Sequence, residues 1–387
     1  MDGNDVHPIY LDSHATTPVD PRVLEAMLPF FTEHFGNASS RNHPFGWKAG
    51  KAVEQAREQV GALIGARFRD VVFTSGATES NNLAIKGLAA RAPAGRRHIV
   101  TIATEHRAVL DPCRTLERSG FRVTYLDVDS QGRIDLDRLR DAVADDTLLV
   151  SAMSANNEIG VLHPLGEIAA IAHATGALLH CDAAQSAGLI RLDVKELGVD
   201  LVSLSAHKMY GPKGVGALYV AKRDPAMAVD PLIDGGGHER GYRSGTLNVP
   251  AIVGFGKAAE LCRESADTDT ARLRALRDRL WSALSKVDGI QVNGPMEPRL
   301  PNNLNVRVAG VHGESLLKAI AADVAVSSGA ACATASAEPS HVLRAIGLSE
   351  EDARASIRFG LSRFNNEQEI DSAAALFTAA TRQLRRA

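Results

Sequence analysis

The chain of 387 residues predicts one large and one smaller domain, because domains average roughly 150 residues. An apolar share of 45% and a charged share of 23% exclude disordered, collagen-like and coiled-coil proteins. The net charge of −3 offers no basic surface for nucleic acid. No apolar run reaches the ~18–20 residues of a membrane span, and the acidic N-terminus is unlike a secretory signal. We therefore expect a soluble, cytoplasmic protein.

The first predicted helix begins at Asp20-Pro21, with Asp as the N-cap and Pro as the first helical residue. Short apolar runs then alternate with helical patterns such as Glu79–Ala90 and Ala108–Arg118. The predicted strands are Val71–Thr74, His98–Ile102, Phe121–Leu126, Leu148–Ala152, Ala177–Cys181, Leu201–Leu204 and Gly216–Val220. This alternation predicts an α/β fold, a mostly parallel seven-stranded sheet with helices on both faces, in a large domain over residues 15–260.

The pattern changes near residue 260, where a smaller α+β domain is expected over residues 261–387 together with residues 1–14. A leucine stripe predicts a helix over Arg272–Val287. Further strands are predicted at Ile290–Asn293, Leu304–Val308, Val324–Ser327 and Ser356–Leu361, with helices at Glu314–Ala322, Ser340–Ile346 and from Asn366 onward. The small-residue segment Ala330–Ala337 has no periodicity and is predicted to be a flexible loop.

Polar residues follow the predicted strands at the sheet edge where ligands of such folds gather. Ser75–Glu79 follows the first strand, and its backbone N–H groups with the Thr78 hydroxyl could hold a phosphate at the start of a helix. His106 and the pair Asn156-Asn157 follow two other strands. On their own, these residues are equally typical of a capped turn, a structural histidine and ordinary turn chemistry.

Asp182 and Lys208 also follow predicted strands and are more specific. A carboxylate directly after an apolar strand costs several kcal/mol to bury unless it meets a cation. A desolvated lysine loses its proton readily and can form a Schiff base, although most lysines are surface residues. Phosphate cradle, imidazole, acid and amine together are what pyridoxal phosphate requires. A nicotinamide site fits less well, because no G-x-G-x-x-G motif follows a strand.

The four cysteines form no C-x-x-C pair, which excludes a disulfide scaffold and a cysteine-based zinc site, and no metal is expected. Cys113, Cys181 and Cys262 lie in helix or strand patterns and are interpreted as small buried residues. Cys332 instead lies in the predicted loop, where an exposed thiol is a liability unless it is used. We therefore interpret Cys332 as a nucleophile.

Long motifs spread over nearly the whole chain resemble the group I cysteine desulfurases of the NifS/IscS type, in the class V aminotransferase family. The segments that carry the resemblance are Tyr10–Pro21, Phe73–Leu83, Thr104–Leu110, Asn156–Gly160, Ser205–Gly216, Gly235–Thr246 and Ser327–Pro339. The resemblance implies a fold-type I pyridoxal-phosphate enzyme and a homodimer with the site near the subunit interface. It also implies conversion of L-cysteine to L-alanine, with the sulfur held as a persulfide on the enzyme.

The resemblance also implies roles by position. Lys208 resembles the lysine that forms the Schiff base with pyridoxal 5′-phosphate, Asp182 the partner of the ring nitrogen, and Cys332 the residue that receives sulfur. Gln185 matches the residue at the cofactor's phenolic oxygen, and His106 matches the imidazole that stacks on the ring and exchanges protons. The positions that match phosphate contacts are Ala77, Thr78, Ser205 and His207, with Thr246 supplied by the other subunit. Asn157 and Arg358 match the positions that hold the substrate's carboxylate.

Some positions depart from the family's usual pattern, namely Ser13-His14, Ala206, Ala330 and Ala333, and none of them removes a catalytic group. Alternative functions are a selenocysteine lyase, a pyridoxal-phosphate aminotransferase, and a silent sulfur-relay scaffold, which the lysine, aspartate and cysteine argue against. The expected partner is a sulfur-acceptor protein, a scaffold or a relay, in iron–sulfur cluster assembly or nucleic-acid thio-modification. No direct contact with nucleic acid or membrane is expected.

Overall fold

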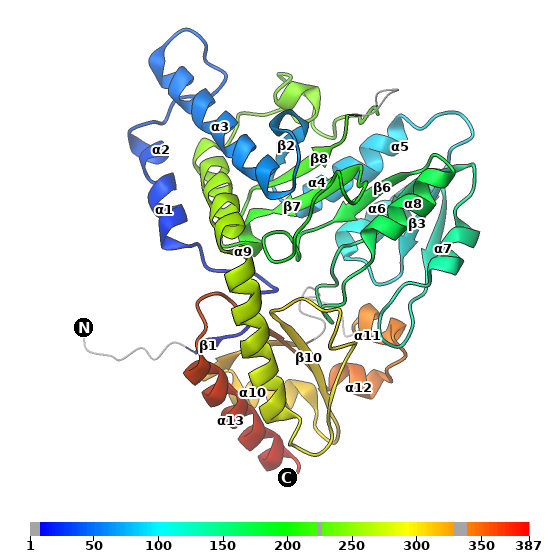
Figure 1. The fold of residues 1–387 in the computed structure, drawn as a ribbon, viewed down its shortest axis with the longest axis vertical. Coiled ribbons are helices and arrows are strands. Elements are labelled where there is room, and N and C mark those ends of the chain that lie inside the picture. The colour runs from blue at the N-terminus through cyan, green and yellow to red at the C-terminus, as the bar shows by residue number, and fades with distance from the viewer. Residues whose placement is uncertain (1–7, 223–226, 329–338, 387) are drawn as a thin grey trace.

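The computed structural model describes residues 8–222, 227–328 and 339–386, arranged in two lobes that share one long helix (Figure 1). The strands are β1 (Ile9–Tyr10), β2 (Val71–Thr74), β3 (His98–Ile102), β4 (Arg122–Leu126), β5 (Thr147–Ser151), β6 (Leu178–Asp182), β7 (Leu201–Ser205), β8 (Gly216–Val220), β9 (Ile290–Val292), β10 (Asn303–Val308), β11 (Val324–Ala325), β12 (Ser327–Ser328) and β13 (Ser356–Gly360).

The α-helices are α1 (Pro21–Met27), α2 (Pro29–Thr32), α3 (Pro44–Leu63), α4 (Ala77–Asn82), α5 (Leu88–Ala90), α6 (Arg107–Arg118), α7 (Leu136–Ala142), α8 (Leu165–Ala174), α9 (Val249–Leu284), α10 (Gly313–Ile320), α11 (His341–Ala345), α12 (Glu350–Arg354) and α13 (Glu367–Leu384). A π-helical segment, Leu83–Gly87, joins α4 to α5. Short 3-10 turns are η1 (Phe68–Asp70), η3 (Ala206–Lys208) and η4 (Glu239–Gly241). No helix in the described ranges combines the length and apolar composition of a membrane span.

The upper lobe is built on a seven-stranded sheet in the order β2-β8-β7-β6-β5-β3-β4. Every neighbouring pair is parallel except the two that involve β8, so the carboxyl ends of all strands but β8 lie at one edge. This confirms the predicted α/β architecture. It also explains how polar residues that follow five separate strands come together.

Successive residues of these strands point to opposite faces, and each face is buried under helices. Val71 and Phe73 pack on one face with residues of α1, α3, α7, α8 and the first half of α9. Val72 packs on the other face with residues of the π-helical segment Leu83–Gly87, of α5 and of α6. Burial on both faces explains why these strands appear in the sequence as continuous apolar runs without alternation.

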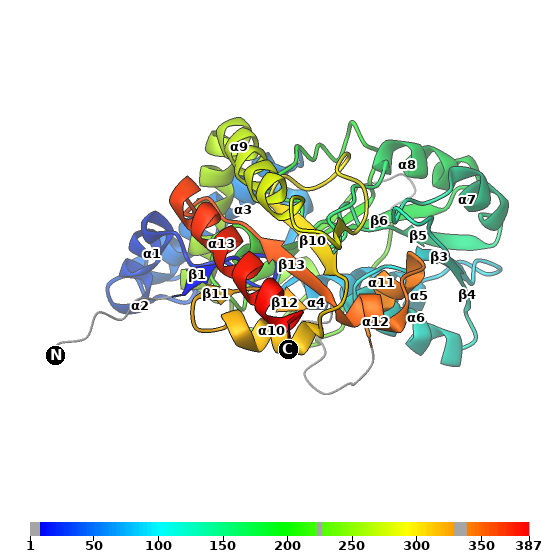
Figure 2. The ribbon, with the colours of Figure 1, turned by 90° about the horizontal axis from the view of Figure 1, so that it is seen from below.

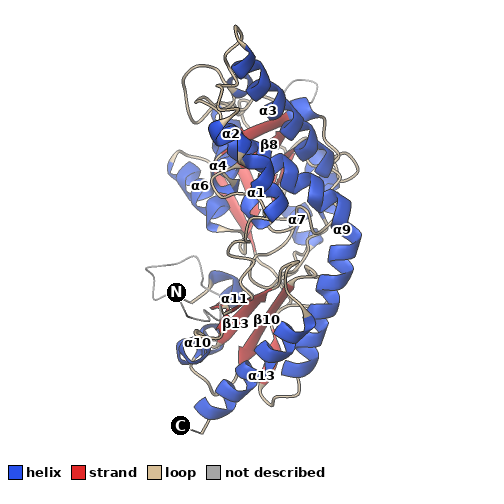
Figure 3. Ribbon diagram, turned by 90° about the vertical axis from the view of Figure 1, so that its left-hand side faces the viewer, coloured by secondary structure: helices blue, strands red, loops and turns tan. Residues whose placement is uncertain are grey.

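Helix α9 is much longer than the predicted helix over Arg272–Val287, because it begins at Val249. Its first half contains Ile252 and Phe255 and packs in the core of the upper lobe, while its second half contains Leu273 and packs in the lower lobe (Figure 3). The first half is buried on most sides, so the sequence there lacks the polar face that marks an amphipathic helix. The predicted domain boundary at residue 260 lies inside this helix.

The lower lobe contains a four-stranded antiparallel sheet in the order β12-β13-β10-β9. Its core lies between this sheet and the helices α9, α10 and α13 (Figure 2). The N-terminal segment crosses from this lobe to the upper one: Ser13 N donates to Gly360 O at 2.9 Å, and Thr17 N donates to His207 O at 2.9 Å. The segment thereby places residues 12–20 between the small sheet and the edge of the large one.

Candidate active site

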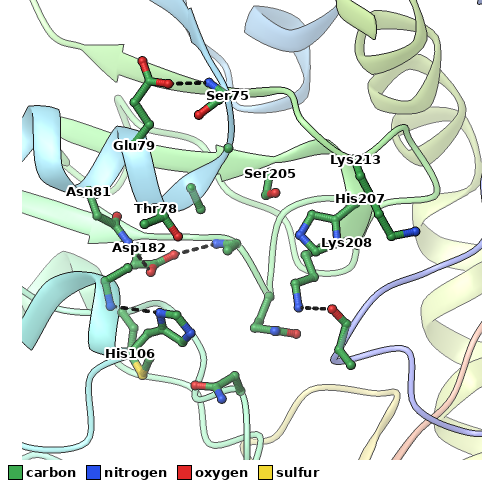
Figure 4. A pocket seen from close by; sticks show the side chains of 18 of the residues that line it. Ser75, Thr78, Glu79, Asn81, His106, Asp182, Ser205, His207, Lys208 and Lys213 are labelled. Atoms are coloured by element: carbon green, nitrogen blue, oxygen red, sulfur yellow. Dashed lines mark hydrogen bonds between the residues drawn. The ribbon is translucent and has the colours of Figure 1, made fainter. Parts of the chain in front are cut away.

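A cavity of about 410 Å³ opens at the edge where the strands of the large sheet end, which is within the usual range for small-molecule sites. Its walls come from the residues after β2, β3, β5, β6 and β7 (Figure 4). Nine of the predicted site residues line it: Ala77, Thr78, His106, Asn157, Asp182, Gln185, Ser205, His207 and Lys208. Most of the predicted site residues therefore line one cavity.

One wall is the turn from β2 into α4, formed by Ser75, Gly76, Ala77 and Thr78. Gly76 has a φ of +154°, a conformation that favours glycine. Gly216 in β8 is packed so closely that a Cβ there would lie 2.6 Å from Gly76 Cα. The first N–H groups of a helix have no carbonyl partner within it, so this wall offers donors and a positive helix end to an anion.

A buried carboxylate, Asp182, ends β6 and faces the cavity. It accepts hydrogen bonds from Asn81 Nδ2 at 2.7 Å and from Ala184 N at 3.0 Å. Both of these donors are neutral. A buried carboxylate held only by neutral donors on a cavity wall favours a cationic group in the cavity.

A second carboxyl group, Glu105, lies buried near Asp182 and was not predicted. It accepts a hydrogen bond from Met153 N, and burial together with the charge of Asp182 raises its pKa well above the ordinary value. Burial and the charge of Asp182 therefore favour the neutral form of Glu105, since a second buried carboxylate close by disfavours the charged form. Its position between Thr104 and His106, directly after β3, is the only sequence signal that could have pointed to it.

Lys208 lies on the opposite side of the cavity from Asp182, at the end of the 3-10 turn that follows β7 (Figure 4). Its Nζ donates to the backbone carbonyls of His14 and, at 2.9 Å, Ala15. Next to it, His207 Nδ1 contacts Thr16 Oγ1 at 3.1 Å. Burial, and then the charge of Lys208, lowers the pKa of His207 to about 4, so this imidazole is neutral near pH 7.

The imidazole of His106 is the N-cap of α6, and its Nδ1 accepts a hydrogen bond from Ala108 N at 3.1 Å. This contact fixes the ring against the helix start and leaves its edge on the cavity wall. Gln185 lies on the same cavity and donates from Nε2 to the His14 carbonyl at 3.1 Å. Both side chains are therefore held in place by backbone groups.

His14 is the second residue that was not predicted, although Ser13-His14 was noted as unusual. Its Nδ1 donates to Gln185 Oε1 at 2.9 Å, and its Nε2 accepts from Asn303 Nδ2 at 3.1 Å. Burial, followed by the charge of Arg358, lowers its pKa to about 3. The ring is therefore neutral and links the large-sheet cavity to strand β10 of the small sheet.

Two predicted site residues among those that the structure describes do not line the cavity. Arg358 in β13 is buried and donates to Asn157 O and to Asp12 Oδ1, each at 3.0 Å, so it reaches Asn157 but not the wall itself. Thr246 is exposed and lies off the cavity, on the segment before α9. Cys332 lies outside the described residues.

The groups on this cavity can bind an anion at one end, hold a cationic ring nitrogen at Asp182, and present an amine to a carbonyl carbon. That set of parts matches a phosphorylated pyridine aldehyde better than a nucleotide, because one small cavity contains all three. Asn81, the third residue that was not predicted, completes the set by orienting Asp182.

Comparison with known proteins agrees with this geometry. The family model described as aminotransferase class V matches residues 9–372. "Cysteine desulfurase IscS" of Anaeromyxobacter sp. (strain Fw109-5) is 59% identical over 379 residues, which cover 98% of this chain and 93% of that relative. A solved structure described as "NifS-like protein" has a TM-score of 0.90 at 38% identity and covers 98% of this chain and 100% of that chain.

A second solved structure, "SspA in complex with cysteine", has a TM-score of 0.81 at 37% identity and covers 92% of this chain and 99% of that chain. The family match spans every residue that lines the cavity. The resemblance therefore includes the site as well as the scaffold.

Proposed function

This chain belongs to the class V aminotransferase family, and we propose that its cavity at the sheet edge binds pyridoxal 5′-phosphate beside Lys208. The protein is a pyridoxal-phosphate-dependent cysteine desulfurase, which converts L-cysteine to L-alanine and passes the sulfur on. The observation that carries the assignment of the cavity is the buried carboxylate of Asp182, which faces Lys208 across it.

The residues present fit this cofactor. Asp182 has only neutral donors in its two hydrogen bonds, so a protonated ring nitrogen would supply the missing cation. The turn Ser75–Thr78 would take the phosphate, with Ser205 and His207 on the same wall. When bound, pyridoxal phosphate supplies a protonated ring that withdraws electrons from the reacting carbon of the substrate.

Within this assignment the side chains divide the proton transfers between them. Asp182 would keep the ring nitrogen protonated, and the raised pKa of the nearby Glu105 favours a neutral group beside Asp182. Lys208 removes the Cα proton of the substrate, because its amine lies on the cavity and two backbone carbonyls hold it there. His106 exchanges a proton at the substrate sulfur.

Cys332 receives the sulfur. Its thiolate forms an S–S bond with the substrate sulfur while the carbon–sulfur bond breaks, and the electron pair of that bond stays with the carbon skeleton, which takes up a proton on its way to alanine. A free thiol has a pKa of about 8.5, so only a small fraction is thiolate near neutral pH and a base is needed. This role rests on the sequence motif.

Asn157 and Arg358 are assigned to the carboxylate of the substrate. Asn157 lines the cavity, and Arg358 donates to its backbone carbonyl from below at 3.0 Å. Because Asp12 accepts from the other end of the Arg358 guanidinium, the arginine is fixed in direction before substrate arrives. A substrate carboxylate in the cavity would then be held by Asn157 at the wall and by the positive charge of the oriented guanidinium bonded to it, which does not itself line the cavity.

A second copy of this chain is the proposed partner in a homodimer. Large apolar side chains are exposed on α1, α2, the start of α3 and the turn between them, with Phe35 at 64%, Trp47 at 59% and Phe31 at 58% exposed. Leu28 and Phe45 add to the same region. The Phe35 and Phe45 rings lie with their centroids 5.3 Å apart, and large exposed apolar side chains that gather in this way favour burial against a protein partner. The sulfur acceptor is a different protein, of an iron–sulfur or nucleic-acid thio-modification pathway.

The test is sulfur transfer by a Cys332→Ser variant. We expect it to bind pyridoxal phosphate with the same visible absorbance as the wild type but to form no protein persulfide and little alanine. Cys113→Ala, which changes a buried cysteine, should keep both activities. Sulfide release by Cys332→Ser at the wild-type rate would contradict the assignment, and a preference for selenocysteine over cysteine would favour a lyase.

A further inference from the structure

The backbone just after Lys208 adopts a conformation that side chains rarely take. Tyr210, two residues further on, has a φ of +65° and is almost completely buried. Only Glu239 and Arg240 share a positive φ among the non-glycine residues of the described ranges. Such residues persist where the surrounding contacts over-determine the conformation, and they are concentrated at functional sites.

The N-terminal segment holds the backbone of Tyr210 on both sides. Its N–H donates to Thr17 Oγ1 at 2.9 Å, and its carbonyl accepts from Asp20 N at 2.9 Å. The same Thr17 hydroxyl donates to the carbonyl of His207 at 3.0 Å. One hydroxyl therefore bridges the residue before Lys208 and the residue two positions after it.

The side chain of Tyr210 is held by a different part of the chain, the residues that follow β13. Its hydroxyl accepts a hydrogen bond from Arg363 N at 2.8 Å, and the Arg363 guanidinium lies 4.1 Å from the centroid of the tyrosine ring. The rings of Tyr210 and Phe364 pack in a T-shaped arrangement with their centroids 5.5 Å apart. Arg363 is itself fixed by Asp269 of α9, at 3.0 Å. These contacts hold the tyrosine ring in one orientation and thereby restrain the backbone to which it is attached.

We propose that Tyr210 is a positioning residue for Lys208: its ring, clamped by Arg363 and Phe364, keeps the turn after β7 in the one conformation that places the Lys208 amine on the side of the cavity opposite Asp182. The proposal deepens the proposed function and rests on it. The turn is short, and β7 fixes its beginning. A relaxation at residue 210 must therefore be taken up at residues 207–209, because φ and ψ are the only soft backbone torsions.

The clamp also explains why the small lobe matters to a site on the large sheet. Arg363 and Phe364 belong to the lower lobe, Thr17 and Asp20 to the N-terminal segment, and Lys208 to the large sheet. Through Tyr210, all three reach the same turn. The amine of Lys208 contacts the carbonyls of His14 and Ala15, and the backbone after Lys208 is held through Tyr210. Both restraints come from residues outside the lobe of the large sheet.

The experiment replaces Tyr210 with glycine, which accepts the positive φ and removes the clamp. We expect Tyr210→Gly to bind pyridoxal phosphate but to lower kcat by about 10- to 100-fold, because small misplacements of a catalytic group have effects of that size. KM for cysteine should stay nearly constant. The visible circular dichroism of the bound cofactor, measured without substrate, should fall, since it depends on how the cofactor is held.

Arg240→Gly is the matched control, because it relieves a similar φ of +59° away from Lys208. It should leave the visible circular dichroism and kcat as in the wild type. Tyr210→Phe, which loses only the hydroxyl contact, should show a smaller change in the same direction. If Tyr210→Gly does not fold, Tyr210→Phe is the variant that tests the positioning role.

Wild-type circular dichroism and kcat in Tyr210→Gly, or in Tyr210→Phe when the glycine variant does not fold, would overturn the positioning role while leaving the proposed function intact. A wild-type protein without any visible cofactor band would instead contradict the proposed function. The two failures are therefore distinguishable.

Discussion

The cavity has two sides that are built in different ways. The Asp182 side is made by residues directly after β2 and β6, and its partners Asn81 and Ala184 belong to the same lobe. The Lys208 side is made by a turn whose contacts come from residues 14–20 and 363–364, at both ends of the chain. One side belongs to the sheet, and the other is assembled at the junction of the two lobes.

This difference separates binding from reaction. The sheet side offers a rigid anion site and a fixed carboxylate, which suits a cofactor that stays bound. The junction side holds Lys208, whose amine changes partners during turnover in the proposed mechanism, and its restraints come from the N-terminal segment and, through Tyr210, from residues 363–364. Movements between the lobes would therefore act on Lys208 before they act on Asp182.

The largest effect is expected when the reactive group of the junction side, the amine of Lys208, is removed. Lys208→Ala should lower alanine formation by at least ~10³-fold, because both the cofactor's attachment point and the base are lost. Lys213→Ala, which changes another lysine on the cavity wall, is the control and should retain activity within a few-fold. Alanine assays on both proteins test this, and appreciable turnover by Lys208→Ala would show that another group is the base.

A change on the sheet side should act on binding instead. Gly76→Ala places a Cβ in the anion site at a φ of +154°, and we expect the dissociation constant of pyridoxal phosphate to rise about tenfold, equivalent to about 1.4 kcal/mol. Gly95→Ala is matched in strain, with a φ of +84° and no atom within 4 Å of its Cβ, and should change only stability. Equal affinities in both variants, measured by fluorescence titration, would place the phosphate elsewhere.

A third change concerns the pH dependence of folding and leaves the reaction itself aside. His14 has a pKa lowered to about 3 in the folded protein, against 6.5 when unfolded, so the unfolded state binds more protons between these values and stability falls as pH drops through this range. His14→Gln removes this loss, worth about 2 kcal/mol between pH 7 and pH 5. Urea unfolding at the two pH values tests it, and parallel losses in both proteins would contradict the burial of His14.

Much of the sheet side could be predicted from sequence. Asp182 ends the buried strand β6 and Thr78 lies in the turn after β2, and parallel strands bring their ends to one edge. The same signal located Lys208 of the junction side, which lies in the turn after β7. The partners of these residues could not be predicted in the same way. Asn81, Glu105 and His14 act through contacts with residues distant in sequence, which leave no periodic signal.

The long helix α9 was underestimated for a related reason. Its first half is packed between α3 and the large sheet and therefore shows apolar residues on most sides, while its second half has the stripe that a surface helix requires. Arg358 was predicted to hold the substrate's carboxylate together with Asn157; it donates to the Asn157 carbonyl but does not line the cavity. Sequence patterns locate elements and their ends, whereas the depth of a side chain depends on the packing of both lobes.

The most direct test of the central claim is to identify the lysine that holds the cofactor. The purified protein is loaded with pyridoxal phosphate, reduced with borohydride to make the attachment permanent, digested, and examined by mass spectrometry. The account predicts the reduced cofactor on Lys208 alone. Attachment to Lys213, or to no lysine of the protein, would contradict it.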